Sequence, residues 1–140
     1  MGVGEVMAAG VPAALGIRLM TVAITLALAR HTAGCRRVAL GGSILASATT
    51  LSLAAGVLAS GRQVDGVLLR HAASGMVFSY AVAPVSAWFL MVLGIVAIPV
   101  AFYSAGYLAH AVAASRMAGV GIGFNALLGS VELVFAAGDV

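Results

Sequence analysis

The chain has 140 residues, of which 63% are hydrophobic and 8% are charged. An average soluble domain is about 45–50% apolar and about 25% charged, and a domain of this size buries only about two-thirds of its chain surface on folding. So many apolar side chains would leave large hydrophobic patches exposed to water. The composition therefore excludes an ordinary soluble fold and indicates that lipid surrounds the chain.

The charged residues are few and scattered along the chain. All seven basic residues are arginines, four acidic residues oppose them, and the formal net charge is +3. Nucleic-acid binding needs Lys and Arg gathered on one face, whereas these arginines fall between apolar runs, so we exclude nucleic acid as a partner. The bias toward Ala, Gly, Val and Arg without Lys is typical of a GC-rich bacterial genome, so we expect a multi-pass protein of a bacterial cell membrane.

Four segments are long and apolar enough to cross a bilayer as helices, which takes about 20 residues each. In chain order, the expected spans cover about residues 6–29, 38–59, 84–109 and 117–138. The first span is interrupted by Arg18, the second and third carry no charge, and the fourth holds Asn125 and Glu132. The predicted fold is an all-α membrane protein with four transmembrane helices in a single domain, residues 1–140.

Prolines set the limits and shape of the third span. The uncharged stretch 72–109 is too long for one crossing, and proline suits the first turn of a helix, where its missing N–H costs nothing. We therefore expect an extended segment over 76–83 and a helix that begins at Pro84. Pro99 falls inside that helix and is expected to kink it, because the carbonyl of Ile95 loses its hydrogen bond.

The arginines also predict the orientation in the membrane. Arg30, Arg36 and Arg37 lie with His31 and Cys35 in the segment expected as a loop between the first two spans. The positive-inside rule places this loop in the cytoplasm and the amino terminus outside. The loop between the second and third spans, which contains both Arg62 and Asp65, is then also outside.

Two ionisable residues fall within spans, and we predict that they form an ion pair. Arg18 and Glu132 would each cost about 2.5–3.5 kcal/mol if unpaired at the centre of the bilayer. Their expected depths differ by about 6 Å at a rise of about 1.5 Å per residue, which a guanidinium side chain can bridge. In the alternative, each side chain extends separately toward its nearer membrane surface.

Polar and small residues on the last span share helix faces. Asn125, Gly129 and Glu132 follow an i, i+4, i+7 pattern and therefore lie on one face, which is either part of a proton path or a polar stripe for helix packing. Gly119 and Gly123 form a G-x-x-x-G pair, which predicts a close helix–helix contact there.

The sequence offers no recognisable active site or cofactor site. The three histidines fall in predicted loops or at membrane surfaces without metal-ligand spacing, and a single cysteine cannot build a Cys-based metal site. We expect no catalytic residue, metal or cofactor in this chain.

Three stretches resemble the antiporter-like large membrane subunits of hydrogenase-4 and formate hydrogenlyase, relatives of the proton-pumping membrane subunits of respiratory complex I (NADH–quinone oxidoreductase). Residues 83–90 (APVSAWFL) look like that family's Asp-Pro-Leu-Ser-Ala-Phe-Phe-Leu helix start, and residues 103–108 (YSAGYL) are similar to its Tyr-Ser-x-Gly-Tyr-Leu. Residues 124–130 (FNALLGS), followed by 137–140 (AGDV), resemble its Phe-Asn-x-Phe-x-x-Ser-Met helix and Ala-Gly-Asp-Val exit.

The resemblance implies a membrane-arm subunit that works with other membrane and peripheral subunits, to which electron transfer would belong. The sequence departs from the family at Ala83, where the family has a helix-capping aspartate, and at Glu132, where it usually has a leucine. Arg18 has no family counterpart that we can name. The family's proton path uses helices after the fourth, so the resemblance implies a fragment, a truncated product or one piece of a split subunit.

Two hypotheses from other functional classes, a small transporter and a pore former, stay open. Small four-helix transporters exchange a cation or proton at a membrane glutamate, and Glu132 could serve in this way. A lysis-type pore former is a third possibility, although such proteins usually carry a charged tail that this chain lacks.

Overall fold

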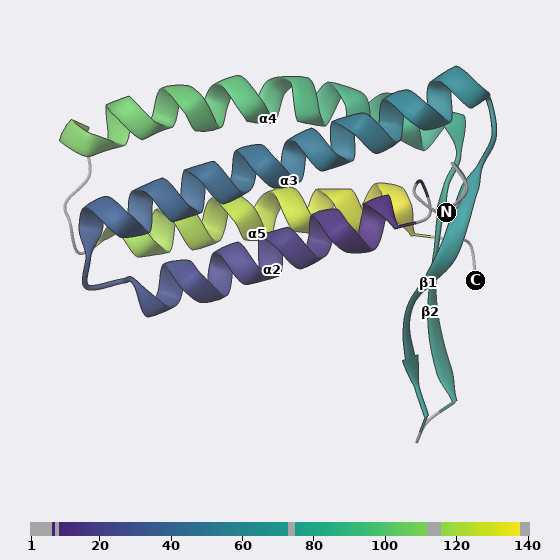
Figure 1. The fold of residues 1–140 in the computed structure, drawn as a ribbon, viewed down its shortest axis with the longest axis horizontal. Helices are drawn as coiled ribbons and strands as arrows, with labels where there is room; N and C mark the ends of the chain where they lie inside the picture. The colour runs from purple at the N-terminus through teal and green to yellow at the C-terminus, as the bar shows by residue number, and fades with distance from the viewer. Residues whose placement is uncertain (1–6, 8, 73–74, 112–115, 138–140) are drawn as a thin grey trace.

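A computed structural model of the chain describes residues 7, 9–72, 75–111 and 116–137. Its helices lie side by side along a common axis (Figure 1). In chain order they are α2 (Gly10–Ala27), α3 (Thr32–Ser60), α4 (Pro84–Ala111) and α5 (Met117–Ala136). All four are long and apolar enough to cross a membrane, and the structure is that of a multi-pass membrane protein.

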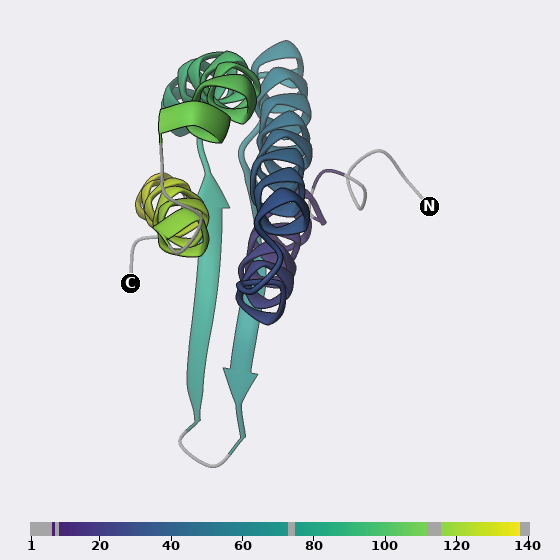
Figure 2. The ribbon, with the colours of Figure 1, turned by 90° about the vertical axis from the view of Figure 1, so that its left-hand side faces the viewer.

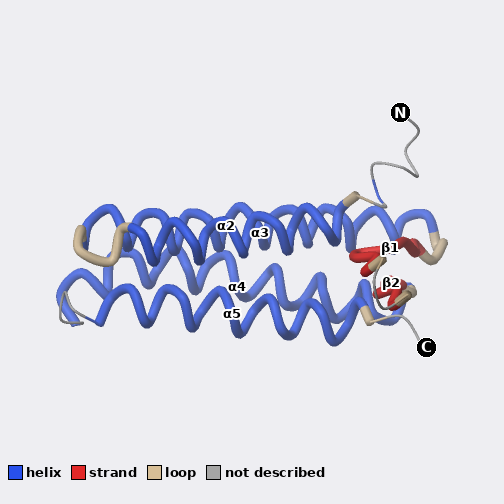
Figure 3. The backbone as a smooth tube through the Cα atoms, turned by 90° about the horizontal axis from the view of Figure 1, so that it is seen from below, coloured by secondary structure: helices blue, strands red, loops and turns tan. Residues whose placement is uncertain are grey.

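Helices α3 and α5 form the centre of the bundle, because each of them contacts the other three helices. Viewed from one end, α4 and α5 lie on one side and α2 and α3 on the other (Figure 2). The α2–α3 turn lies at one end of the bundle, and the segment that joins α3 to α4 lies at the opposite end (Figure 3). We call these the loop end and the hairpin end.

The hairpin end carries a two-stranded antiparallel sheet. Strand β1 (Val64–His71) pairs with β2 (Met76–Val82), with Val64 opposite Val82 and an irregularity between Val67 and Leu69. The strands run across the helix ends and project beyond the bundle (Figures 1 and 2). The all-α prediction is therefore wrong for this segment, although the extended conformation expected over 76–83 is confirmed. Residues 64–71 were expected as a loop, but their Val and Leu side chains find cross-strand partners in β2.

The observed helix limits differ from the expected spans mainly at the loop end. Helix α3 begins at Thr32 rather than near residue 38, so Arg36 and Arg37 lie in its first turns and Cys35 is buried rather than in a loop. Arginine is a good helix former, so a helix can begin before Arg36 and Arg37. The positive-inside rule predicts the side of the membrane on which these arginines lie, and it does not predict where the helix begins. Pro84 is the first residue of α4, as expected, and Pro99 lies inside it. The expected span ends at residues 6 and 138 lie outside the described residues.

Buried apolar side chains occur along the whole bundle, whereas the buried polar ones come from three of the four helices. Close to the hairpin end, apolar side chains from all four helices and β2 form one cluster: Val11, Leu53, Ala54, Val57, Tyr80, Val82, Ala87, Leu90 and Ala136. The buried polar side chains of the described residues come from α2, α3 and α5: Arg18, Thr21, Thr25, Ser43, Ser47, Thr50, Asn125 and Glu132.

Small residues allow the three polar helices to approach closely. A side chain at Gly42 would overlap Thr21 of α2, and one at Gly121 would overlap Ala39 of α3. The predicted contact at Gly119 and Gly123 is wrong within this chain, because both glycines are exposed and nothing lies within 4 Å of a Cβ at either. The face of α5 that carries Asn125 and Glu132 points into the bundle, and Gly121 lies on that face. Gly121, rather than Gly119 or Gly123, therefore makes the close contact with a neighbouring helix.

Candidate functional site

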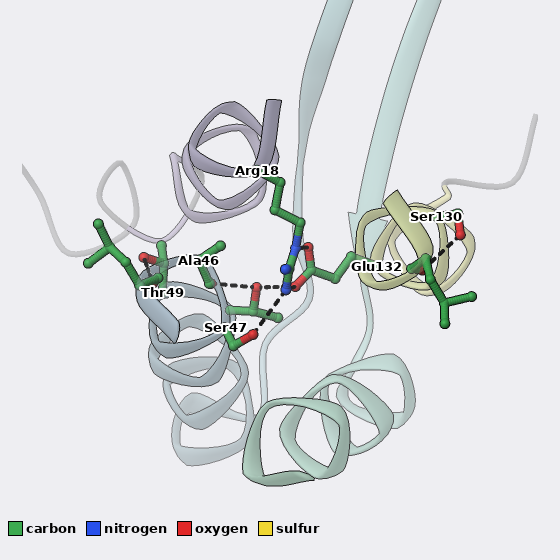
Figure 4. A network of polar contacts seen from close by, with 9 residues as sticks. Arg18, Ala46, Ser47, Thr49, Ser130 and Glu132 are labelled. Atoms are coloured by element: carbon green, nitrogen blue, oxygen red, sulfur yellow. Dashed lines mark hydrogen bonds and ion pairs between the residues drawn. The ribbon is translucent and has the colours of Figure 1, made fainter. Parts of the chain in front are cut away.

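The structure brings Arg18 of α2 and Glu132 of α5 into direct contact. Arg18 donates two hydrogen bonds to the carboxylate, from Nε to Oε2 and from Nη2 to Oε1, each 2.7 Å long. Figure 4 shows the guanidinium reaching across from α2 to meet the carboxylate. Such a two-point contact is the strongest geometry available to an arginine and a carboxylate.

Two hydroxyls of α3 complete the site. Arg18 Nη2 also donates to Ser47 Oγ at 3.1 Å, and Thr50 Oγ1 lies 2.7 Å from Glu132 Oε1 and 3.1 Å from the carbonyl of Ala46. The single hydroxyl hydrogen of Thr50 can serve one of these two acceptors at a time. The pair thus connects three helices, because α2 and α5 supply the charges and α3 supplies the hydroxyls.

The pair is shielded from its surroundings. The side chains of Arg18 and Glu132 are only 4% and 5% exposed. Each charge neutralises the other, and removing one partner of a buried pair typically costs about 3–5 kcal/mol because it leaves an uncompensated charge. The pair therefore helps to hold α2, α3 and α5 together.

Asn125, the third candidate residue, is buried but occupies a separate position. Its Nδ2 donates to the carbonyls of Ala39, at 2.9 Å, and Gly121, at 3.0 Å. Asn125 precedes Glu132 by seven residues, or about 10 Å along the helix axis, so it lies nearer the loop end. Gly129, between them, packs against Arg18, whose Cδ would be 3.4 Å from a Cβ at that position.

The hydroxyl residues of α2 and α3 were not predicted as part of this polar site. On α3, Ser43, Ser47 and Thr50 follow the same i, i+4, i+7 spacing as Asn125, Gly129 and Glu132 on α5. Thr21 and Thr25 follow Arg18 at i+3 and i+7. Such spacing places residues on one helix face, so a search for matching polar stripes on all spans would have found them.

A small cavity adjoins the site on the side of the hairpin end. Its volume is about 10 Å³, and it lies between Thr50, Glu132 and apolar residues that include Leu53 and Leu90. That volume is about the minimum for one water molecule. Among the described residues, no cluster of three or more His, Cys, Asp or Glu side chains could hold a metal ion.

Comparisons of the sequence with protein-family models and with curated proteins find no match.

Proposed function

We propose that the chain is a membrane-arm subunit, or a piece of one, of a hydrogenase-type or complex-I-like oxidoreductase. In this role it is a helical scaffold and contributes to proton translocation, while partner subunits carry out electron transfer. The location that fits this role is a bacterial cell membrane, with the hairpin end and the amino terminus outside and α4 bent at Pro99.

The observation that carries the proton role is the Arg18–Glu132 pair. Ionisable groups are expensive inside a membrane, and where they occur they mark ion paths, proton relays or tight pairs. Here a carboxylate lies inside an apolar bundle with a counter-ion and two hydroxyls around it. Neutralised by Arg18, Glu132 is stable in the resting protein, and a displacement of the guanidinium would free it to bind a proton.

The resemblance to hydrogenase membrane subunits supports the oxidoreductase role, and its three stretches fall in the following elements. The stretch 83–90 spans the start of α4, with its proline at the first helical position. The stretch 103–108 lies in the last part of α4, and 124–130 lies within α5. Residues 138–140 of the third stretch lie outside the described residues.

Purification from native membranes in a mild detergent tests the oxidoreductase role. We expect the chain to co-elute with iron–sulfur subunits and with hydrogenase or NADH-linked dye-reducing activity. Elution of the chain alone, with no redox activity in the same fractions, would contradict the proposal.

A second candidate, a small proton-coupled transporter that uses Glu132, is favoured by the burial of this glutamate at the contact of three helices. Reconstitution of the purified chain in vesicles separates the two roles. A transporter would give proton-coupled uptake by the chain alone that Glu132→Gln abolishes, whereas a membrane-arm subunit would give none.

A further inference from the structure

Three side-chain oxygens in the loop-end half of the bundle are buried without a hydrogen-bond partner. They are Thr25 Oγ1 of α2, Ser43 Oγ of α3 and Asn125 Oδ1 of α5. Thr25 and Ser43 are 0% exposed and Asn125 is 1% exposed. Burying a polar group without a partner is costly, and nearly all such groups in proteins are hydrogen-bonded to protein or to water.

The three residues are neighbours. Asn125 donates to the carbonyl of Ala39, and Ser43 follows Ala39 by four residues, one turn along the same face of α3. On the other side, Asn125 donates to the carbonyl of Gly121. A Cβ at Gly121 would lie 3.6 Å from Thr25 Cγ2 and would overlap Ala39. Thr25 and Asn125 thus both lie beside Gly121, and Ser43 lies one turn from the carbonyl that Asn125 binds, where α2, α3 and α5 meet.

The orientation of the Asn125 amide follows from its partners. Both groups near its Nδ2 are backbone carbonyls, which can only accept hydrogen bonds. The nitrogen must therefore face Ala39 and Gly121, and the oxygen, an acceptor, must face away from them. The unpartnered acceptor is a property of the site and not of an ambiguous amide assignment.

We propose that Thr25, Ser43 and Asn125 form a site for buried water between α2, α3 and α5. A buried water usually makes two to four hydrogen bonds to polar groups that lack other partners. The site offers two hydroxyls, which donate and accept, and one amide oxygen, which accepts. Water can hydrogen-bond to all three groups because it both donates and accepts, whereas an apolar ligand can hydrogen-bond to none of them.

The site extends toward the Arg18–Glu132 pair. Along α2, Thr21 and Arg18 follow Thr25 toward the hairpin end at spacings of four and three residues, and Arg18 Nη1 is likewise buried without a partner. Beyond the pair, the apolar cluster that includes Val57 and Leu90 fills the bundle. The buried polar side chains thus continue from the water site to the Arg18–Glu132 pair, and the apolar cluster lies on the far side of the pair. This inference does not depend on the redox role.

The sequence permits a direct test, because it contains one asparagine, Asn125, and one glutamine, Gln63. The full chain, labelled with ¹⁵N in its asparagine and glutamine side chains, is placed in lipid bilayers. Solid-state NMR then measures magnetisation transfer from water to each side-chain amide. Gln63 is exposed and serves as the hydrated reference. We expect clear transfer to Asn125 at mixing times close to those that saturate Gln63.

Two double variants sharpen the test. Thr25→Val with Ser43→Ala removes both hydroxyls, and we expect a several-fold loss of transfer to Asn125 with Gln63 unchanged. Thr49→Val with Ser52→Ala removes two hydroxyls that already donate to carbonyls of their own helix, and we expect transfer to Asn125 as in the wild type.

The measurement on the wild-type chain tests the water site even if a variant fails to fold. Absence of transfer to Asn125 while Gln63 is saturated would overturn the proposal. It would mean that the site is dry and that the hydroxyls of Thr25 and Ser43 rotate to donate to carbonyls of their own helices instead.

Discussion

At the scale of single residues, the Arg18–Glu132 pair makes a charge test possible. Arg18→Ala leaves a buried carboxylate without its counter-ion, and we expect a loss of about 3–5 kcal/mol in stability with reduced accumulation in the membrane. Adding Glu132→Gln to the same chain removes the uncompensated charge and should partly restore accumulation. Quantitative blotting of membrane fractions measures both effects.

Arg116→Ala is the control for this test, because Arg116 is exposed at the start of α5, and it should leave accumulation unchanged. If the losses caused by Arg18→Ala and Glu132→Gln simply add in the double variant, the two side chains do not stabilise each other. The contact would then be incidental.

The stability of the hairpin end is expected to fall at alkaline pH because of Tyr80 in β2. Burial, and secondarily the negative charge of Asp65, raise the pKa of Tyr80 above its ordinary value of 10.0. The folded state then holds the proton more tightly than the unfolded state. Its contribution to stability is complete below about pH 10 and is lost as the pH rises toward the folded-state pKa.

We therefore expect the thermal unfolding temperature in detergent to fall above about pH 10 and the fall to be smaller in Tyr80→Phe. Tyr103→Phe provides the matched control, because Tyr103 is 71% exposed and its removal should leave the pH profile as it is. An identical profile for Tyr80→Phe and the wild type would show that another group is responsible.

Part of the site could be read from the sequence, and part could not. Arg18 and Glu132 stand out because a charge in an apolar run is costly wherever the run folds. The hydroxyls of Ser47 and Thr50 do not stand out, since Ser and Thr are tolerated on any face of a membrane helix. Their role depends on which face of α3 meets α2 and α5, and that is settled by packing between segments far apart in the chain.

At the scale of elements, Gly42 sets the distance between α2 and α3. A Cβ at this position would overlap the side chain of Thr21, whereas a Cβ at Gly41 would meet nothing within 4 Å. We expect Gly42→Ala to cost about 1–3 kcal/mol, the usual range for overpacking, and Gly41→Ala to cost little. Unfolding in mixed micelles compares the two. Equal stability of the variants would mean that the helices are not in close contact at Gly42.

The amino end of α4 lacks a side-chain cap. Ala83 precedes the proline at the first helical position, and its carbonyl accepts the hydrogen bond from the Ala87 N–H, but its methyl group cannot accept one from the first turn. Ala83→Asp supplies an acceptor for the N–H of Ser86, and we expect a gain of about 0.5–2 kcal/mol. Slower amide exchange at Val85 and Ser86 would report it.

Ala83→Val is the control for the cap, since it adds bulk without an acceptor and should not slow exchange. Faster or unchanged exchange in Ala83→Asp would show that another group already satisfies the first turn of α4.

The elements were predictable to the extent that local patterns define them. Four apolar runs gave four helices, and Pro84 marked the start of α4 because a proline constrains its own backbone. Strand β1 was not predictable, because its sequence mixes Asp65, Gly66 and Arg70 with apolar residues, without the regular alternation that marks a strand. It forms because Leu69 and Phe78, nine residues apart, become cross-strand partners, a contact that no single segment encodes.

At the scale of the whole molecule, the bundle is asymmetric along its axis. Its buried polar side chains lie between Thr25 and Glu132, and the apolar cluster together with the hairpin covers the end beyond Glu132. The arginines near the loop end favour the cytoplasm as the location of that end.

That orientation predicts opposite labelling of two exposed positions. Gln63 lies at the hairpin end and Arg116 at the loop end, and both are exposed. With Cys35→Ala as the background, we expect a membrane-impermeant maleimide to label Gln63→Cys in intact cells and to label Arg116→Cys only after the membrane is opened. Both variants should react after solubilisation, which controls for local reactivity. Labelling of Arg116→Cys alone in intact cells would show the reverse topology, with the loop end outside the cell and the hairpin end in the cytoplasm.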